Sequence, residues 1–378
     1  MLSNFKKLCA VALLLYVLVS ASQVPPLRTI RRNIRRQRQK AQQPHPLPQS
    51  VEEIEIPDEY KTLENGELFL LYDSGSDDEN RFFIFGTAAS LDMLAGADHL
   101  FMDGTFKIVP QIFFQLYTVH ALNNAGYIIP CAYVLLPNKT KNMYSRLFDQ
   151  LIQMRPNLAP TSIMIDFEQA AMQSAAEKFP TANVTGCFYH LSQNVFRKVQ
   201  AEGLQVRYTE DVEFSTQVRM VMALAFVPQA SVVDAFEELQ DFADAEMGPI
   251  LDYFEDTYIG RKRRRNRAPP KYAHGLWNVE ERLVDGLPRT NNAVEGWHRH
   301  MQSAVACQHP NLWKFLQVLK KEQGVNNLLI AQANADVAPP KQCKVYEDVT
   351  RRLTTIAQDF ANRNVVDYLR GIAMNISV

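Results

Sequence analysis

Three apolar runs in close succession constrain the fold of this chain more than any other feature: residues 100–109, 113–122 and 128–136. A polar turn at 123–126, Asn-Asn-Ala-Gly, separates the last two runs and predicts antiparallel neighbouring strands. Helix and strand patterns then alternate, beginning and ending with a helix: residues 143–154, 162–165, 167–179, 184–188 and 191–200. Antiparallel strands followed by such alternation predict an α/β fold, with a mixed sheet flanked by helices.

The segments on either side of this core have different patterns. Residues 67–72 and 81–85 are two further strand candidates, and 91–97 is a short helix candidate. From 212 to 256 the apolar spacing is helical throughout, and a last helical stretch begins near Asn292. The sequence therefore predicts an all-helical region between the α/β core and that last stretch.

Composition excludes little, and local charge is more informative. The 378 residues are 47% hydrophobic with a net charge of -1, which is typical of a globular protein and indicates no class of partner. Two runs are strongly basic, with seven positive residues at 28–40 and six at 261–267. Each is a candidate contact for phosphates or import receptors, or else a solvated stretch. The five cysteines are scattered without a C-x-x-C pair, so neither a disulfide framework nor a zinc ribbon is indicated.

The N-terminus has the three-part form of a secretory signal peptide. Two lysines precede an apolar run at 8–19, and small residues follow at 20–22. The run is too short to span a membrane comfortably as a helix. Residues 23–57 are rich in proline, glutamine and arginine, so we expect a disordered linker there.

Two aspartates follow apolar strands at positions where carboxylates can gather. Asp103 stands between an apolar strand and a glycine, and Asp166 follows the strand at 162–165. If those strands are neighbours, both carboxylates meet at one sheet edge, where they repel each other unless a cation neutralises them. Mg²⁺ prefers carboxylate oxygens, and two such ions could activate water and stabilise a leaving 3′ oxygen in phosphodiester cleavage.

Each acidic residue also has a purely structural interpretation, which the local pattern favours. Asp103 and the glycine after it could form a turn, and Asp166 could cap a helix with Gln169 completing a capping box. Glu295 could complete the same motif with Asn292. A helix cap and a metal ligand are not exclusive, so both interpretations stay open.

Cys187 and His190 pair a thiol with an imidazole, with two residues between them. A structural zinc site normally needs four ligands, so the pattern favours a buried cysteine followed by a polar helix start. His298 and His300 add imidazoles after Glu295, or are surface residues of the same helix.

No phosphate-binding GxxxxGK[ST] loop or GxSxG elbow occurs, which gives no case for a P-loop ATPase or a serine hydrolase.

Several blocks in a fixed order resemble Mutator-like element (MULE) transposases, from about Asp73 to about Leu319. The blocks are DSGSDDENRFFIFGT (73–87), FMDGTFKIVP (101–110), IMIDFEQAA (163–171), GCFYHLSQN (186–194) and WNVEERLVDGLPRTNNAVEGWHRHMQ (277–302). The resemblance implies a DDE-type transposase with a ribonuclease H-like fold. In that fold a mixed sheet is flanked by helices, and an all-helical insertion precedes the last catalytic helix.

The resemblance also implies roles for individual residues. Asp103 and Asp166 match the two aspartates and Glu295 matches the glutamate, so these three are expected to be catalytic and to bind metal. Cys187 and His190 match the family's C-x-x-H. The implied cofactor is Mg²⁺ or Mn²⁺, as two ions, without a small-molecule cofactor. The implied chemistry is metal-dependent cleavage at transposon ends, then transfer of the 3′ hydroxyl strand into target DNA.

DNA is the implied partner, as transposon ends and as target, and we expect a homo-oligomer because two ends must be brought together. Trp297 could stack on an unpaired base or pack in the core, and His298 is a further candidate contact. The basic run in the insertion could hold DNA phosphates. Its candidate residues are Arg261, Lys262, Arg263, Arg264, Arg265 and Arg267.

With the resemblance, the chain divides into seven expected segments. They are a signal-like apolar leader (1–22), a disordered basic linker (23–57), a strand pair with a helix (58–97), the ribonuclease H-like MULE domain (98–200), a helical insertion (201–288), the catalytic-glutamate helix region (289–330) and a C-terminal helical tail (331–378).

Two features depart from the family pattern. No spacing of cysteine and histidine before Asp73 fits the zinc-binding DNA-recognition module that members often carry. The leader conflicts with the nuclear location that the resemblance implies, and we interpret it as a gene-model artefact. There are two alternatives. Either the apolar run does not function as a signal, or the chain is a domesticated copy that is directed to a new compartment. The rival functions are a domesticated, non-transposing DNA-binding or regulatory protein and, from the leader alone, a secreted or membrane-anchored protein.

Overall fold

The computed structural model describes residues 25–41, 45–264, 266–339 and 343–376. The chain forms two compact units, residues 1–48 and residues 49–378. The signal-like leader expected at 1–22 lies outside the described residues, as does Arg265 of the basic run.

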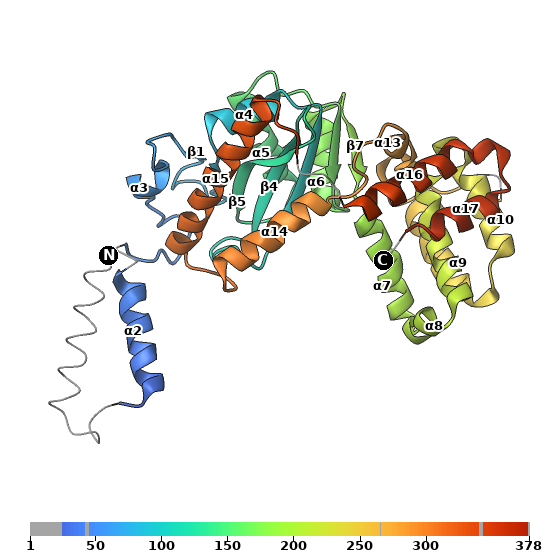
Figure 1. The fold of residues 1–378 in the computed structure, drawn as a ribbon, viewed down its shortest axis with the longest axis horizontal. Helices are drawn as coiled ribbons and strands as arrows, with labels where there is room; N and C mark the ends of the chain where they lie inside the picture. Colours follow the sequence, from blue (N-terminus) through green and yellow to red (C-terminus); the bar gives the residue numbers. More distant parts are fainter. Residues whose placement is uncertain (1–24, 42–44, 265, 340–342, 377–378) are drawn as a thin grey trace. The chain divides into compact units, whose positions relative to one another are not determined.

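The first unit has a helix, α2 (Leu27–Ala41), inside the segment predicted to be a disordered linker (Figure 1). For these residues the prediction of disorder is wrong. The helical stretch contains no proline or glycine, and its leucine, arginine, glutamine and lysine residues favour a helix. At its start, the carbonyl of Pro26 accepts hydrogen bonds from the backbone N–H groups of Thr29 and Ile30. The proline and glutamine content that predicted disorder belongs mainly to the residues after the helix.

Among the described residues of the second unit, seven strands form one mixed sheet (Figure 1). In spatial order they are β1 (Leu70–Asp73), β2 (Phe83–Phe85), β5 (Ile128–Leu136), β4 (Gln115–Leu122), β3 (His99–Thr105), β6 (Ser162–Ile165) and β7 (Asn183–Gly186). Strands β4 and β5 are antiparallel neighbours, as the turn at 123–126 predicts, and β3 also pairs antiparallel with β4. Strands β6 and β7 continue from β3 in parallel. The predicted α/β class with a mixed sheet is confirmed.

Side chains along each central strand are buried alternately on the two faces of the sheet. In β5, Val134 and Leu136 join the apolar cluster on one face, and Tyr133 and Leu135 join the cluster on the other. Burial on both faces requires a cover on each side. One face is covered by α4 (Ala88–Ala95), α5 (Lys141–Met154) and α6 (Gln169–Lys178), and the other by α14 (Asn292–Val305) and α15 (Leu312–Asn334).

Short polar side chains set where two of the covering helices begin. The Thr87 hydroxyl accepts the backbone N–H of Ser90 at the start of α4, and the Thr140 hydroxyl accepts that of Met143 at the start of α5. Such caps satisfy N–H groups that have no partner inside the helix, and each contributes about 1 kcal/mol.

The remaining helices of the second unit lie mostly in an all-helical part, as predicted for the insertion. They are α3 (Asp58–Lys61), which packs on α15, and α7 (Phe188–Ala201), α8 (Gln205–Glu210), α9 (Val212–Ala223), α10 (Val232–Phe242), α11 (Gly248–Phe254), α12 (His274–Trp277), α13 (Glu280–Val284), α16 (Lys344–Gln358) and α17 (Val365–Ala373). The C-terminal helix α17 packs on α9 and α10, where Tyr368 donates a hydrogen bond to the carbonyl of Phe226 (Figure 1). No helix among the described residues is both long and apolar enough to cross a membrane.

Candidate metal centre at the edge of the sheet

Asp103 and Asp166 lie at the same edge of the sheet, on neighbouring strands. Asp103 belongs to β3, and Asp166 directly follows the last residue of β6. The two strands pair in parallel with Phe101 opposite Met164, and each aspartate stands two residues beyond that pair. Because adjacent strands are about 4.8 Å apart, the two carboxyl groups share one space. The two strands are therefore neighbours, which is the condition under which the sequence analysis expects both carboxylates at one sheet edge.

The surroundings of Asp166 disfavour its negative charge. Burial raises the pKa of Asp166 to about 7, and the charges of Asp103 and Glu168 act in the same direction. A hydrogen bond from the backbone N–H of Glu168 and the charge of Lys139 act in the opposite direction. Among the described residues, no lysine or arginine forms an ion pair with either aspartate, and the partner of Asp103 is His298. A nearby cation would favour the ionised form of both carboxyl groups.

The start of helix α14 brings Glu295 to this edge. The backbone N–H of Asn291 donates to the sulfur of Cys187 at 3.2 Å, and the Asn291 side-chain amide donates to the carbonyl of Met102 at 3.3 Å. These two bonds fasten the beginning of α14 to β3 and to the start of α7. Glu295 stands in the first turn of α14, where burial first and the charge of Asp103 second raise the pKa of its carboxyl group.

His298 follows Glu295 by one helical turn and contacts Asp103 from behind. Its Nδ1 is 3.4 Å from Asp103 Oδ2, and its Nε2 is 3.2 Å from the hydroxyl oxygen of Thr118. The same hydroxyl is 3.0 Å from Nε2 of His120, so a buried polar chain supports the Asp103 carboxylate. The prediction that His298 contacts DNA is therefore corrected, because its buried imidazole packs inside the protein.

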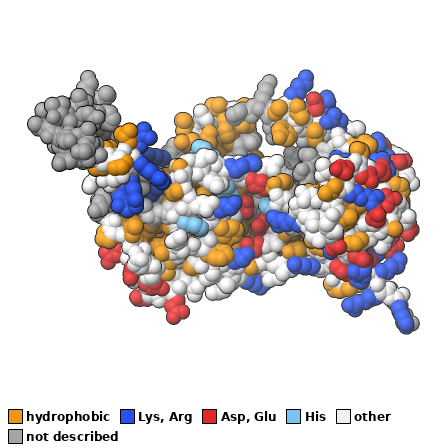
Figure 2. Space-filling view, turned by 90° about the horizontal axis from the view of Figure 1, so that it is seen from below, with side chains coloured by type: hydrophobic (Ala, Val, Ile, Leu, Met, Phe, Trp, Pro, Cys, Tyr) orange, Lys and Arg blue, Asp and Glu red, His pale blue; other side chains and the backbone are white. Residues whose placement is uncertain are grey.

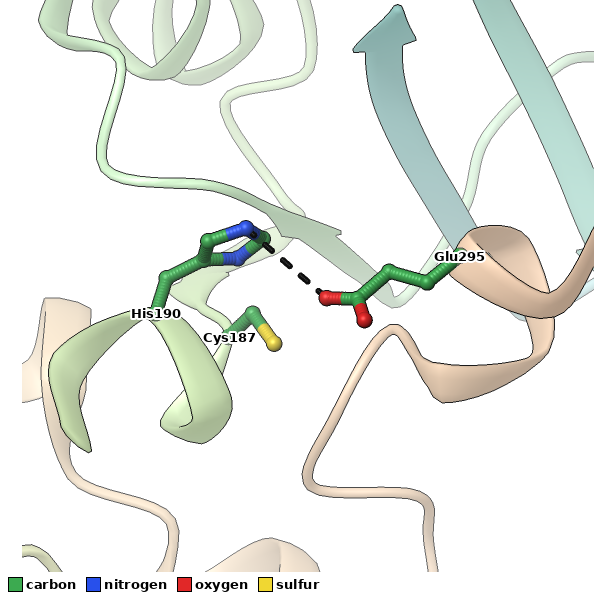
Figure 3. Close-up of side chains that lie close together, drawn as sticks. All are labelled: Cys187, His190 and Glu295. Carbon is green, nitrogen blue, oxygen red and sulfur yellow. Dashed lines mark ion pairs between the residues drawn. The ribbon is translucent and has the colours of Figure 1, made fainter. Parts of the chain in front are cut away.

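Cys187 and His190 meet Glu295 at the start of α7, as Figure 3 shows. One donor atom from each of the three residues lies within 4.8 Å of the other two. His190 Nε2 is 3.8 Å from Glu295 Oε1. Burial lowers the pKa of His190 and raises the pKa of the Cys187 thiol to about 12. Cys187 and His190 thus lie beside the acidic residues. They stand at the start of α7, and a buried cysteine followed by a polar helix start is what the sequence predicts.

Glu168 is an acidic residue of this site that the sequence analysis did not single out. The Tyr144 hydroxyl donates to Glu168 Oε1 at 3.0 Å and in turn accepts the Gln115 side-chain amide at 2.7 Å. Burial raises the pKa of Glu168, which indicates that it faces the same poorly solvated space. Its position two residues after Asp166, in the block IMIDFEQAA, was the available signal.

The structural interpretations of the three acids are not borne out. Asp103 lies inside β3, not in a turn. The N-cap residue of α6 is Glu168, without a side-chain capping bond, and therefore not Asp166. The N-cap residue of α14 is Asn291, also without such a bond, so Glu295 completes no capping box. The positions of these acids are therefore not explained by capping or turn formation.

Much of the basic run at 261–267 is paired with acidic side chains, and its interpretation as a row of phosphate contacts stays a prediction. The pairs are Arg261 with Asp252 and Asp256, Lys262 with Glu237, and Arg267 with Glu237 and Glu255. Figure 2 shows acidic and basic side chains interspersed over the helical part on the face in view. Only Arg263 and Arg264 are exposed without an ion pair among the described residues of the run.

Trp297 packs against the sheet, so the alternative of a core role is the correct one. Its ring stacks on that of Tyr133, with centroids 5.4 Å apart, and meets the edge of His120 at 5.6 Å. Its indole N–H donates to Glu322 of α15 at 2.9 Å. These contacts join α14 to β5 and α15.

Fold and site together define a mixed α/β domain with a carboxylate-rich centre of the kind that binds divalent metal. Residues 99–194 match the family model of the MULE transposase domain, so this segment of the chain is similar to that family. The matched segment contains Asp103, Asp166, Cys187 and His190, whereas Glu295 lies beyond it. A domain of this kind suggests, in general terms, an interaction with DNA and a dependence on divalent metal. No curated protein matches the chain.

Proposed function

We propose that the chain is the catalytic core of a DDE-type DNA transposase related to Mutator-like elements. Asp103, Asp166 and Glu295 are its catalytic residues and hold Mg²⁺ or Mn²⁺, as two ions. Its substrates are transposon ends and target DNA, and its reactions are phosphodiester cleavage and strand transfer. The protein acts in the nucleus as a homo-oligomer.

The observation that carries the proposal is that three carboxyl groups, from β3, the end of β6 and α14, lie near enough for the charge of Asp103 to raise the pKa values of both Asp166 and Glu295. These elements lie far apart in the sequence, and the Asn291 bonds hold the third one in place. Among the described residues, no lysine or arginine pairs with any of the three. Since carboxylates in a poorly solvated space repel one another, the donor set fits a hard divalent cation.

The topology supports a ribonuclease H-like domain as the scaffold. Of the five strands from β3 to β7, β4 alone runs against the others, and helices cover both faces. Strand ends on the same side of the sheet then bring Asp103 and Asp166 together. The all-helical part before α14 fits the insertion that the resemblance implies.

Neighbouring side chains of the protein hold the acidic residues of this centre in position. His298 and Thr118 fix the Asp103 carboxylate from behind, and Tyr144 fixes Glu168 beside Asp166. When bound, the divalent ions would supply charge stabilisation at a scissile phosphate and activation of a water molecule. Rigid supports of this kind matter because such catalysis depends on positioning and on preorganised charge.

The test is metal-dependent DNA cleavage by the full chain. Wild type, Asp103→Asn, Asp166→Asn and Glu295→Gln are compared on supercoiled and end-labelled DNA, in Mg²⁺ or Mn²⁺ at a fixed salt concentration. We expect each substitution to lower cleavage about 100-fold or more, because a lost metal ligand removes several kcal/mol of transition-state stabilisation. Asp256→Asn, which removes an acidic partner of Arg261, is the matched control and should cleave normally.

Two results would overturn the proposal. Cleavage that survives all three substitutions would belong to another site or to a contaminant. A folded wild-type protein that binds DNA but neither binds metal nor cleaves would favour the domesticated DNA-binding protein instead.

A further inference from the structure

We infer that Cys187, His190 and Glu295 form a second metal site, which selects Zn²⁺ or a similar borderline-soft cation and competes for Glu295 with the acidic centre. The binding of Zn²⁺ at this site does not depend on the proposed function. Its consequence for catalysis rests on the proposed function, because there Glu295 serves the hard metal ions.

The backbone brings three unlike donors together from two helix starts. Cys187 is the N-cap residue of α7, and His190 lies one turn further on the same helix. Glu295 comes from the first turn of α14, which the Asn291 bond to the Cys187 sulfur holds against α7. In Figure 3 the thiol, the imidazole and the carboxylate point toward a common space.

The distances suit a small tetrahedral ion. Zinc bonds of about 2.0–2.3 Å place tetrahedral donor atoms roughly 3.3–3.7 Å apart. The donor atoms of the three residues all lie within 4.8 Å of one another, and His190 Nε2 is 3.8 Å from Glu295 Oε1. Small side-chain rotations therefore suffice to close the site, and the backbone does not have to move.

The donor chemistry separates this group from Asp103 and Asp166. A thiolate and an imidazole are ligands that Zn²⁺ prefers, whereas Mg²⁺ takes oxygen almost exclusively. One thiolate and one carboxylate also carry two negative charges, so a single Zn²⁺ makes the group neutral. Neutrality matters because Cys187 is fully buried, and an uncompensated charge in such a place is costly.

Two polar atoms in this space lack the partners that buried groups normally have. His190 Nδ1 and Glu295 Oε1 are buried, and neither has a hydrogen-bond partner among the described residues. Buried polar atoms in proteins are nearly always bonded, and exceptions often mark an ion or a functional group. A helix-capping cysteine beside a histidine would leave both atoms unexplained, whereas a bound cation uses the carboxylate oxygen directly.

Three protein ligands leave a fourth position for water or another ligand, as in zinc sites that are not purely structural. Occupation by Zn²⁺ would hold Glu295 toward α7. The acidic centre would then be left with Asp103 and Asp166, so Zn²⁺ should inhibit cleavage supported by Mg²⁺. The substitution Cys187→Ser should relieve that inhibition.

The test uses the full chain and Co²⁺ as a spectroscopic probe for Zn²⁺. Wild type should show thiolate-to-cobalt charge-transfer absorption that Zn²⁺ removes on titration. Cys187→Ser should abolish this band, and His190→Gln should weaken binding more than tenfold, because even the loss of an outer-shell partner costs about 10–100-fold in affinity. Cys131→Ser is the matched control, since Cys131 is equally buried but lies outside the group.

The outcomes separate the two proposals. A band that persists in Cys187→Ser, or disappears in Cys131→Ser, overturns the zinc site, and DNA cleavage by wild type would still stand. A band that needs Cys187 and His190, in a protein without cleavage, supports the zinc site and overturns the proposed function. Urea unfolding in the presence of a chelator checks that each variant is folded. If Cys187→Ser is not folded, the Co²⁺ titration of His190→Gln decides whether the zinc site exists.

Discussion

The basic run at 261–267 and the acidic group of Asp103, Asp166 and Glu295 balance their charges in opposite ways. In the basic run, Arg261 and Arg267 each have acidic partners within ordinary hydrogen-bond distance. In the acidic group, Lys139 and Arg299 act on the carboxylates only through their charge, and no lysine or arginine among the described residues forms an ion pair with them. The basic run, which is prominent in the sequence, is thus mostly paired, whereas the acids, which are dispersed in the sequence, form a cluster without such pairs.

This difference shows which kind of charge indicates a binding site. Exposed ion pairs contribute little to stability and need no ligand. Repelling carboxylates at a partly buried sheet edge lower the stability of the protein, so their presence calls for a bound cation. Stability measurements can therefore tell the two regions apart without any knowledge of the DNA substrate.

The largest expected effect is stabilisation of the acidic group by metal. Mn²⁺ at 100 times its Kd should stabilise the wild-type protein by about 2.7 kcal/mol, because it binds the folded state alone. Asp166→Asn should lose most of this gain, and Asp256→Asn, at an acidic partner of the basic run, should keep it. Thermal unfolding with and without Mn²⁺ measures both. An equal shift in wild type and Asp166→Asn would place the bound metal elsewhere.

The pH dependence of the metal-free protein should also differ between the two regions. The pKa of Asp166 is raised from 3.8 to about 7, so between these values the folded state holds a proton that the unfolded state releases. Stability should therefore fall as pH rises through this window, by up to about 1.4 kcal/mol per unit. Urea midpoints in chelator from pH 5 to pH 7 measure the slope, which Asp166→Asn should flatten.

The basic run should respond in the opposite direction and at lower pH. Hydrogen bonds from Arg267 and Arg261 lower the pKa values of Glu237 and Asp256. Their contribution is present above the unfolded pKa values and is lost as pH falls through the lower, folded ones. A slope between pH 5 and pH 7 that persists unchanged in Asp166→Asn would thus show that Asp166 is not its source.

Local patterns explain why much of the fold could be predicted. The antiparallel pairing of β4 and β5 depends on period-two burial and on the turn at 123–126, both of which are visible in a short window. The strand β6 and the helix α5 have equally local signals. Helix α2 was missed because proline-rich neighbours dominated the composition of the window.

Most residues of the candidate site could be named from the sequence, with Glu168 as the exception, but their contacts could not. Asp103 and Asp166 follow strands, so a common sheet edge was a reasonable inference from order alone. The approach of Glu295 to His190 depends on how α14 packs across β3, between residues more than 100 positions apart in the chain. The neutralisation of Arg267 likewise depends on Glu237, which lies on helix α10, 30 residues earlier in the chain.

Removal of a paired arginine should destabilise the protein moderately. Arg267 donates to Glu255, to Glu237 and to the carbonyl of Gly260, and its side chain is largely buried. Arg267→Ala should cost about 2 kcal/mol, because it leaves the buried Glu255 carboxylate without its main partner. Arg263→Ala is the control and should change stability by less than about 0.5 kcal/mol. If both variants lost the same free energy of unfolding, the ion pairs would not be what distinguishes Arg267 from Arg263.

The smallest expected effect concerns DNA affinity. Arg263 and Arg264 are the exposed members of the run without ion pairs among the described residues, so they remain available for phosphates. Each replacement by alanine should weaken DNA binding slightly for all sequences and lower the slope of log K against log salt by about 1. Arg261→Ala should leave that slope unchanged, because Asp252 and Asp256 already occupy its guanidinium. Binding isotherms at several salt concentrations measure the slope. A larger change for Arg261→Ala than for Arg263→Ala would mean that DNA displaces the acidic partners, and the basic run would then resemble the acidic group in needing a ligand.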